Sequence, residues 1–194
     1  KIGLMVNPEQ DDFWEGYYPA LQMAKESGVQ VLHSYLQWSD VEDKPGERSW
    51  EWNDALMGYR FQEGFEISLV INVIHTALRG PIPGDLKDKD FDDPEFIQRF
   101  TVFVLDVLER YPIQYLSLGN EVNDYFVNHR DEIPAYKRFF LAVKDAVNEH
   151  YPDVKVGMTF AYHDAERGNA VDIIQQLNVG DFLPVTLYIY NQGF

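Results

Sequence analysis

The stretch Ile67-Ser68-Leu69-Val70-Ile71-Asn72-Val73-Ile74 is a nearly continuous run of apolar residues, most of them branched at Cβ. A strand with one face in water would alternate apolar and polar side chains, and this run does not. Continuous apolar runs are typical of strands in parallel sheets, because both faces of such a sheet are covered. The run therefore predicts a buried strand of a parallel α/β sheet.

Similar apolar runs recur along the chain and alternate with stretches of helical period. The further runs are Ile2–Val6, Val29–Leu36, Tyr115–Leu118, Val154–Ala161 and Phe182–Tyr190. Between them, Asp93-Pro94-Glu95 is typical of a helix start, with an N-cap residue followed by proline, and an apolar stripe continues after it. Strict alternation of this kind predicts six parallel strands with five intervening helices.

Two architectures fit this alternation, an open doubly wound sheet and a barrel. Open nucleotide-binding sheets usually carry a glycine-rich first turn, whereas the first run here is followed by Asn7-Pro8-Glu9-Gln10-Asp11-Asp12. This favours a (β/α)8 TIM barrel. A complete barrel needs about 250 residues. We therefore expect residues 1–194 to form a single barrel domain with the first six βα units, and strands seven and eight to follow on its C-terminal side.

The composition excludes several classes of partner and chemistry. The 32 acidic and 16 basic residues give a net charge of −16, which disfavours binding to nucleic acid. No apolar stretch reaches the roughly 18 residues of a membrane span. The absence of cysteine excludes disulfides, thiolate catalysis and cysteine–zinc sites.

The acidic stretch from Asp85 to Asp93 is the one candidate for a metal site. An EF-hand loop starting at Asp88 would need glycine at the position of Asp93 and glutamate at that of Arg99, so the pattern fails twice. A solvated loop that leads into the next helix is the better interpretation. We expect neither a metal nor a cofactor.

Active sites of TIM barrels lie at the C-terminal ends of the strands, and this rule selects candidate residues before any motif is considered. Those residues are Asn7, Glu9, Trp14, Gln37, Trp38, Asn72, His75, Thr76, Asn120, Glu121, Tyr162, His163, Asp164, Tyr188 and Tyr190. Aromatic rings stack on sugar faces, while amides and carboxylates hydrogen-bond hydroxyls. The set suits a polyhydroxylated, uncharged ligand.

The most specific motif is Leu116-Ser117-Leu118-Gly119-Asn120-Glu121-Val122-Asn123, in which an apolar strand ends in glycine and Asn-Glu follows. This motif resembles the fourth strand of the clan A glycoside hydrolases, which are (β/α)8 barrels. The stretch from Trp38 to Trp52 resembles the second loop of that clan, and Val185–Tyr190 resembles its sixth strand. The resemblance implies that Glu121 is the general acid/base and that Asn120 hydrogen-bonds the sugar 2-hydroxyl.

The remaining substrate-binding candidates follow from position and residue type. Trp38 is expected to be a sugar platform, and His75 and Asn72 are expected to contact the ligand. Tyr188 and Tyr190 share one strand face, so one of them is expected to reach the pocket.

The function implied by the resemblance is hydrolysis of a β-linked oligo- or polysaccharide with retention of configuration. In that clan the nucleophile is a glutamate at the end of strand seven, which this chain does not include. A secreted or extracytoplasmic location is favoured over the cytoplasm. Two alternatives stay open: a carbohydrate-binding barrel without catalysis, and an unrelated TIM-barrel lyase or isomerase.

Overall fold

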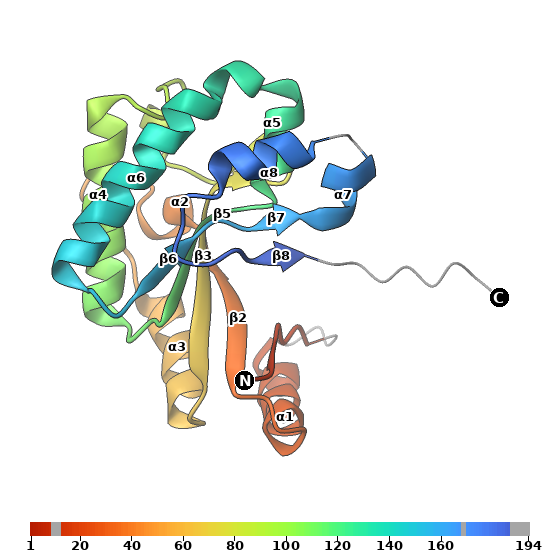
Figure 1. Cartoon of the computed structure of the whole chain (residues 1–194). Coiled ribbons are helices and arrows are strands. Elements are labelled where there is room, and N and C mark those ends of the chain that lie inside the picture. Colours follow the sequence, from red (N-terminus) through yellow and green to blue (C-terminus); the bar gives the residue numbers. More distant parts are fainter. Residues whose placement is uncertain (9–12, 168–169, 187–194) are drawn as a thin grey trace.

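The computed structural model of the chain describes residues 1–8, 13–167 and 170–186. Its main sheet has the strand order β1 (Gly3–Leu4), β2 (Val31–Leu36), β3 (Glu66–His75), β5 (Tyr115–Asn120) and β6 (Lys155–Gly157). All of these neighbours pair in parallel. The predicted run Ile67–Ile74 thus lies within the central strand β3 of this sheet (Figure 1).

The sixth strand of the barrel, β8 (Val185–Thr186), continues this side-by-side order, and β6 and β7 (Phe160–Ala161) are two parts of the fifth. β7 pairs in parallel with β8, and Gly157 forms a parallel bridge with Phe182. Apart from β4 (Leu78–Arg79), a short antiparallel addition to β3, the strands of the main sheet lie side by side in chain order, and β8 pairs with β7, which follows β6 in the chain. A doubly wound sheet would reverse its strand order at a switch point. The absence of such a reversal in the described part of the chain confirms the barrel architecture.

The apolar run Val154–Ala161 was expected as one strand but is divided into β6 and β7. The backbone of Thr159, between them, bonds to the end of β5 and to the start of α5, out of the register of the β5–β6 ladder. Its amide donates to the carbonyl of Gly119 over 3.2 Å, and its carbonyl accepts from the amide of Val122 over 3.0 Å. The interruption therefore results from the close approach of the two strand ends.

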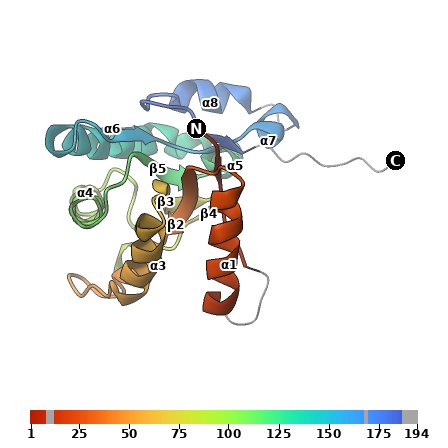
Figure 2. The ribbon, with the colours of Figure 1, turned by 90° about the horizontal axis from the view of Figure 1, so that it is seen from below.

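Helices pack around the outside of the sheet. The helices that connect successive strands on this outer side are α1 (Phe13–Glu26), α3 (Glu51–Gln62), α4 (Pro94–Arg110), α6 (Ile133–His150) and α8 (Val171–Leu177). Figure 2 shows them arranged in an arc around the strands. Asp93 caps α4 as predicted, since its side chain accepts from the amide of Glu95 at 2.8 Å. No helix of the described residues is long and apolar enough to cross a membrane.

Short helices occupy the loops that leave the C-terminal ends of the strands. They are α2 (Trp38–Val41), η1 (Gly84–Leu86), α5 (Val122–Asn128), η2 (Arg130–Glu132) and α7 (Tyr162–Arg167). These short helices thus lie at the end of the barrel where the active sites of TIM barrels are found.

The two faces of the sheet differ in burial. Along β2, the side chains of Leu32, Ser34 and Leu36 are buried under the helices, whereas those between them are partly exposed on the inner face. This inner face lines a cavity of about 590 Å³ near the N-terminal ends of the strands. The residues around it are Lys1, Gly3, Val31, His33, Ser68, Tyr115 and Phe182.

Candidate active site

Left-handed backbone marks the C-terminal ends of β3 and β5. Glu121 directly follows β5 with φ 51° and ψ 42°, and Thr76 directly follows β3 with φ 52°. The two turns touch, because the Thr76 amide donates to the carbonyl of Asn120 at 2.9 Å. A non-glycine residue in such a conformation costs about 1–3 kcal/mol, and such residues cluster at functional sites. The strain points to this corner of the barrel as the candidate site.

The Glu121 side chain is almost completely buried, with 4% of its surface exposed. Its Oε1 accepts a hydrogen bond of 2.5 Å from the hydroxyl of Thr186, which lies on β8. The bond connects the ends of the fourth and sixth strand positions of the barrel. It restricts the orientation of the carboxyl group.

Asn120 is held by a residue from β2. The hydroxyl of Tyr35 donates to Asn120 Oδ1 over 3.3 Å, and the ring of Tyr35 lies edge-on to His75, 6.1 Å away. Burial raises the pKa of Tyr35, and the negative charge of Glu121 raises it further, so the hydroxyl keeps its proton. The structure therefore brings Asn120, Glu121 and His75 together, as the sequence predicted.

A buried amide fixes the turn that presents Glu121. Asn123 is fully buried, and its Oδ1 accepts from the amide of Ala161 at 2.7 Å while its Nδ2 donates to the carbonyl of the same residue at 3.1 Å. The side chain thereby mimics a strand partner for β7 and holds the start of α5 against the sheet.

Gly119 is required by both conformation and space. Its φ is 114°, and a Cβ at this position would lie 2.7 Å from Val122 Cγ1 and 2.9 Å from the hydroxyl of Tyr136. Tyr136 cannot easily move away, because its hydroxyl donates to the carbonyl of Leu118 and its side chain is fully buried.

We expect Gly119→Ala to lower the free energy of unfolding by about 1–3 kcal/mol through overpacking alone, with backbone strain in addition. Urea unfolding followed by circular dichroism measures the change. Gly58→Ala is the matched control, since Gly58 lies in α3 with no atom near its absent Cβ. The control should stabilise the protein by up to about 1 kcal/mol. Equal effects at the two positions would contradict the steric argument.

Asn72 lies on β3 and is 2% exposed. Its Oδ1 is one of the few buried side-chain atoms of the described residues that have no hydrogen-bond partner. A buried polar atom without a partner is costly, and a ligand hydroxyl would satisfy it. The expected ligand contact of Asn72 stays a prediction.

Trp38 does not have the predicted role. It is 0% exposed, its ring stacks on Phe103 with centroids 5.7 Å apart, and the edges of Phe96 and Phe100 close around it. The short helix α2 turns this side chain toward the aromatic residues of α4 instead of toward the barrel mouth. No ring face is left for a ligand, so the sugar-platform assignment was wrong and Trp38 is a core residue.

Tyr188, Tyr190 and Glu9 lie outside the described residues, as do the side chains of His163 and Asp164. Within the described part, no group of three or more His, Cys, Asp or Glu side chains could hold a metal ion.

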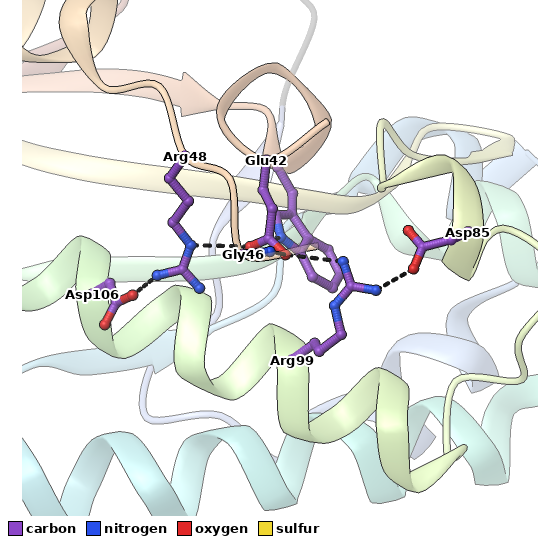
Figure 3. A network of polar contacts seen from close by, with 7 residues as sticks. Glu42, Gly46, Arg48, Asp85, Arg99 and Asp106 are labelled. Atoms are coloured by element: carbon purple, nitrogen blue, oxygen red, sulfur yellow. Dashed lines mark hydrogen bonds and ion pairs between the residues drawn. The ribbon is translucent and has the colours of Figure 1, made fainter. Parts of the chain in front are cut away.

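A buried carboxylate holds the loop that follows Trp38. Glu42 is 2% exposed and accepts from Arg99 Nη2 at 2.9 Å, Arg48 Nε at 3.0 Å, the Gly46 amide at 3.3 Å and Trp38 Nε1 at 3.4 Å (Figure 3). Burial by itself would raise the pKa of Glu42, but these hydrogen bonds outweigh it and hold the pKa below its ordinary value.

Both arginines also pair with a second carboxylate, Arg48 with Asp106 and Arg99 with Asp85 (Figure 3). The five charges connect the loop after β2 with α4 and with η1. The loop that resembles the second loop of clan A is therefore fixed to the outer helix layer by ion pairs, and its Trp38 is fixed with it.

Sequence reasoning missed Tyr35, Thr186 and Asn123, which hold Asn120 and Glu121 in place. Tyr35 could have been identified from the sequence, because it lies two residues after His33 on the same strand. Side chains two residues apart point to the same face of a strand, which here is the inner face. No comparable signal marks Thr186 or Asn123, because their partners lie 65 and 38 positions away in the chain.

No protein-family model and no curated protein sequence matches this chain. Solved structures do match it. An exo-β-1,4-mannosidase, Op5Man5 from Opitutaceae bacterium strain TAV5, matches 82% of this chain and 32% of its own, with 16% identity and a TM-score of 0.64. A GH5_18 protein from Bifidobacterium longum subsp. infantis matches 98% of this chain and 51% of its own, with 13% identity and a TM-score of 0.69.

A β-glucosidase from Thermotoga maritima, in complex with azafagomine, matches 73% of this chain and 36% of its own, with 13% identity and a TM-score of 0.58. The chain thus spans about a third to a half of the length of these solved chains. At these identities the likeness establishes the fold. The resemblance to glycoside hydrolase barrels that the sequence suggested is confirmed at that level.

Proposed function

We propose that residues 1–194 are part of a retaining glycoside hydrolase that acts on a β-linked oligo- or polysaccharide. Glu121 is its general acid/base, and its nucleophilic carboxylate lies outside residues 1–194. The observation that carries the proposal is the buried carboxyl group of Glu121, on a strained turn at the C-terminal end of β5, in a barrel like those of a mannosidase and a β-glucosidase.

The reaction needs two carboxyl groups about 5–5.5 Å apart. One donates a proton to the leaving glycosidic oxygen while the other attacks the anomeric carbon. The first then takes a proton from the water that releases the sugar. The Thr186 hydrogen bond supports the acid/base role of Glu121, because it holds the carboxyl group in one orientation.

The contact of Asn120 with Tyr35 supports a role in sugar binding. Because Oδ1 of Asn120 accepts from the Tyr35 hydroxyl, the amide has a fixed orientation. Its two Nδ2 hydrogens then point away from Tyr35 and can donate to a ligand hydroxyl.

Azide trapping tests the proposal with the intact protein. We expect Glu121→Ala, given an activated dinitrophenyl β-mannoside or β-glucoside and azide, to release the β-glycosyl azide. The glycosyl–enzyme intermediate can still form, because this leaving group needs no proton. Azide can then replace the water that the missing base no longer activates. Nuclear magnetic resonance of the product identifies its configuration.

An α-glycosyl azide would instead identify Glu121 as the nucleophile. Unchanged hydrolysis by the variant, without any azide product, would contradict a catalytic role and favour a carbohydrate-binding barrel or another chemistry. Glu149→Ala, a change of an exposed glutamate on α6, is the matched control and should behave as the unaltered protein.

A further inference from the structure

Exposed aromatic side chains gather on one part of the outer surface. Among the described residues, the exposed tyrosines and tryptophans are Tyr18, Trp52, Tyr59 and Tyr162, at 42–52% exposure. Three of these four lie on α1 and α3, which Figure 2 shows as neighbouring helices on the outside of the sheet. Clustered exposed rings are unusual for a soluble surface and mark interaction sites.

The ring of Trp14 connects those of Trp52 and Tyr59, and Tyr59 in turn contacts Tyr18. The ring of Trp14 lies 5.4 Å from that of Trp52 and 5.3 Å from that of Tyr59, and Tyr59 lies 6.3 Å from Tyr18. We call these four residues the aromatic strip. Trp52 and Tyr59 are seven residues apart on one helix, so the strip is about 10 Å long.

The ring contacts of the strip pack α1 against α3, and polar contacts join the same two helices. The buried hydroxyl of Tyr17 accepts from Arg60 Nε at 2.5 Å, and the same guanidinium donates to Ser34 on β2. On the surface, Lys25 pairs with Glu63 at 2.9 Å. The two helices are therefore connected by polar contacts as well as by ring packing, and Tyr18, Trp52 and Tyr59 still keep 42–52% of their surface exposed.

We infer that the aromatic strip is a second carbohydrate-binding surface, separate from the Glu121 site, which holds a neutral polysaccharide by stacking of its sugar rings. The tryptophan and tyrosine rings offer flat apolar faces, and their N–H and O–H groups can bond sugar hydroxyls. The net charge of −16 favours a neutral ligand over an anionic one, and opposes pairing of two copies of this chain. The inference does not require Glu121 to be catalytic.

Retention on insoluble polymer tests the inference with the intact protein. The binding probes are insoluble β-mannan and cellulose, and the protein carries Glu121→Gln so that the polymer is not consumed. Into this background we place Trp52→Ala with Tyr59→Ala, and separately Tyr59→Phe. Circular dichroism and thermal unfolding establish that each variant folds.

The double variant is expected to bind at least one polymer about tenfold more weakly, while Tyr59→Phe keeps the ring and binds nearly as tightly. Val102→Ala removes an exposed apolar side chain of α4, outside the strip, and should change nothing. With Glu121 intact, hydrolysis of a small aryl glycoside should be equal with and without the strip variants, which separates this site from the catalytic proposal.

Three results would overturn the inference. One is equal retention of the double variant and its parent, which would place all binding elsewhere. Another is the lack of retention of the parent on either polymer. The third is a concentration-dependent dimer that the double variant abolishes, which would make the strip an interface between copies.

Discussion

Replacement of Glu121 by Gln in the intact protein is expected to lower kcat/KM for β-glycosides with poor leaving groups by about 10²–10⁴-fold, the usual contribution of a general acid/base. Gln keeps the shape of the side chain and can still accept the hydrogen bond from Thr186, but it has no proton to give to the glycosidic oxygen. Binding should change little, because the lost interaction belongs to the transition state. Steady-state kinetics with alkyl and aryl glycosides measures the effect.

The dependence on the leaving group is the sharper part of this prediction. A dinitrophenyl glycoside needs no protonation, so its first step should be far less affected than that of an alkyl glycoside. Glu149→Gln on α6 serves as control for the chemical change and should retain full activity. An equal loss for all leaving groups would contradict the acid role of Glu121 and point to a misfolded or misplaced turn.

Removal of the Glu42 carboxylate is expected to have the largest effect on stability. We expect Glu42→Ala to lower the free energy of unfolding by about 3–5 kcal/mol, the range for breaking one partner out of a buried ion pair. The loss leaves Arg48 and Arg99 with one carboxylate each, and it deprives the buried Trp38 indole of its acceptor. Urea unfolding followed by tryptophan fluorescence and circular dichroism measures it.

Glu47→Ala in the same loop is the matched control. Glu47 is exposed and pairs with Lys44 over 3.9 Å, so its removal should cost less than about 1 kcal/mol. Similar losses at the two positions would show that the buried network contributes no more than a surface pair.

The same variant has a defined pH dependence. The pKa of Glu42 is lowered by folding, so its contribution is fully present above the unfolded value near 4.5 and is lost as the pH falls through the folded pKa. The difference in unfolding free energy between the unaltered protein and Glu42→Ala should therefore be constant above about pH 4.5 and shrink as the pH falls below it. A difference that stays constant below about pH 4.5 as well would indicate that lost packing, not lost charge, causes the destabilisation.

Local patterns predicted the fold because each barrel element carries its own signal. The run Ile67–Ile74 has no polar alternation, and Asp93-Pro94 marks a helix start, so β3 and α4 were predicted to within a few residues. The C-terminal-end rule then selected Asn120, Glu121 and His75, which lie together in the structure. These predictions required only the local pattern of apolar residues and the order of the strands along the chain.

Trp38 and the residues that hold Glu121 in place depended on tertiary contacts. A tryptophan at the end of an inner strand can turn to the barrel mouth or to the helix layer, and only Phe96, Phe100 and Phe103 decide between the two. Thr186 likewise acquires its role from a strand that is distant in sequence. Such choices are set by packing and cannot be inferred from single residues.

The pairing of Asn123 with Ala161 has a consequence for the local opening motions of the barrel. The backbone amide of Ala161 has its partner on a helix instead of on a neighbouring strand. Exchange of this amide with solvent requires the first turn of α5 and β7 to separate, so its exchange rate reports how often the turn that carries Glu121 detaches from the sheet.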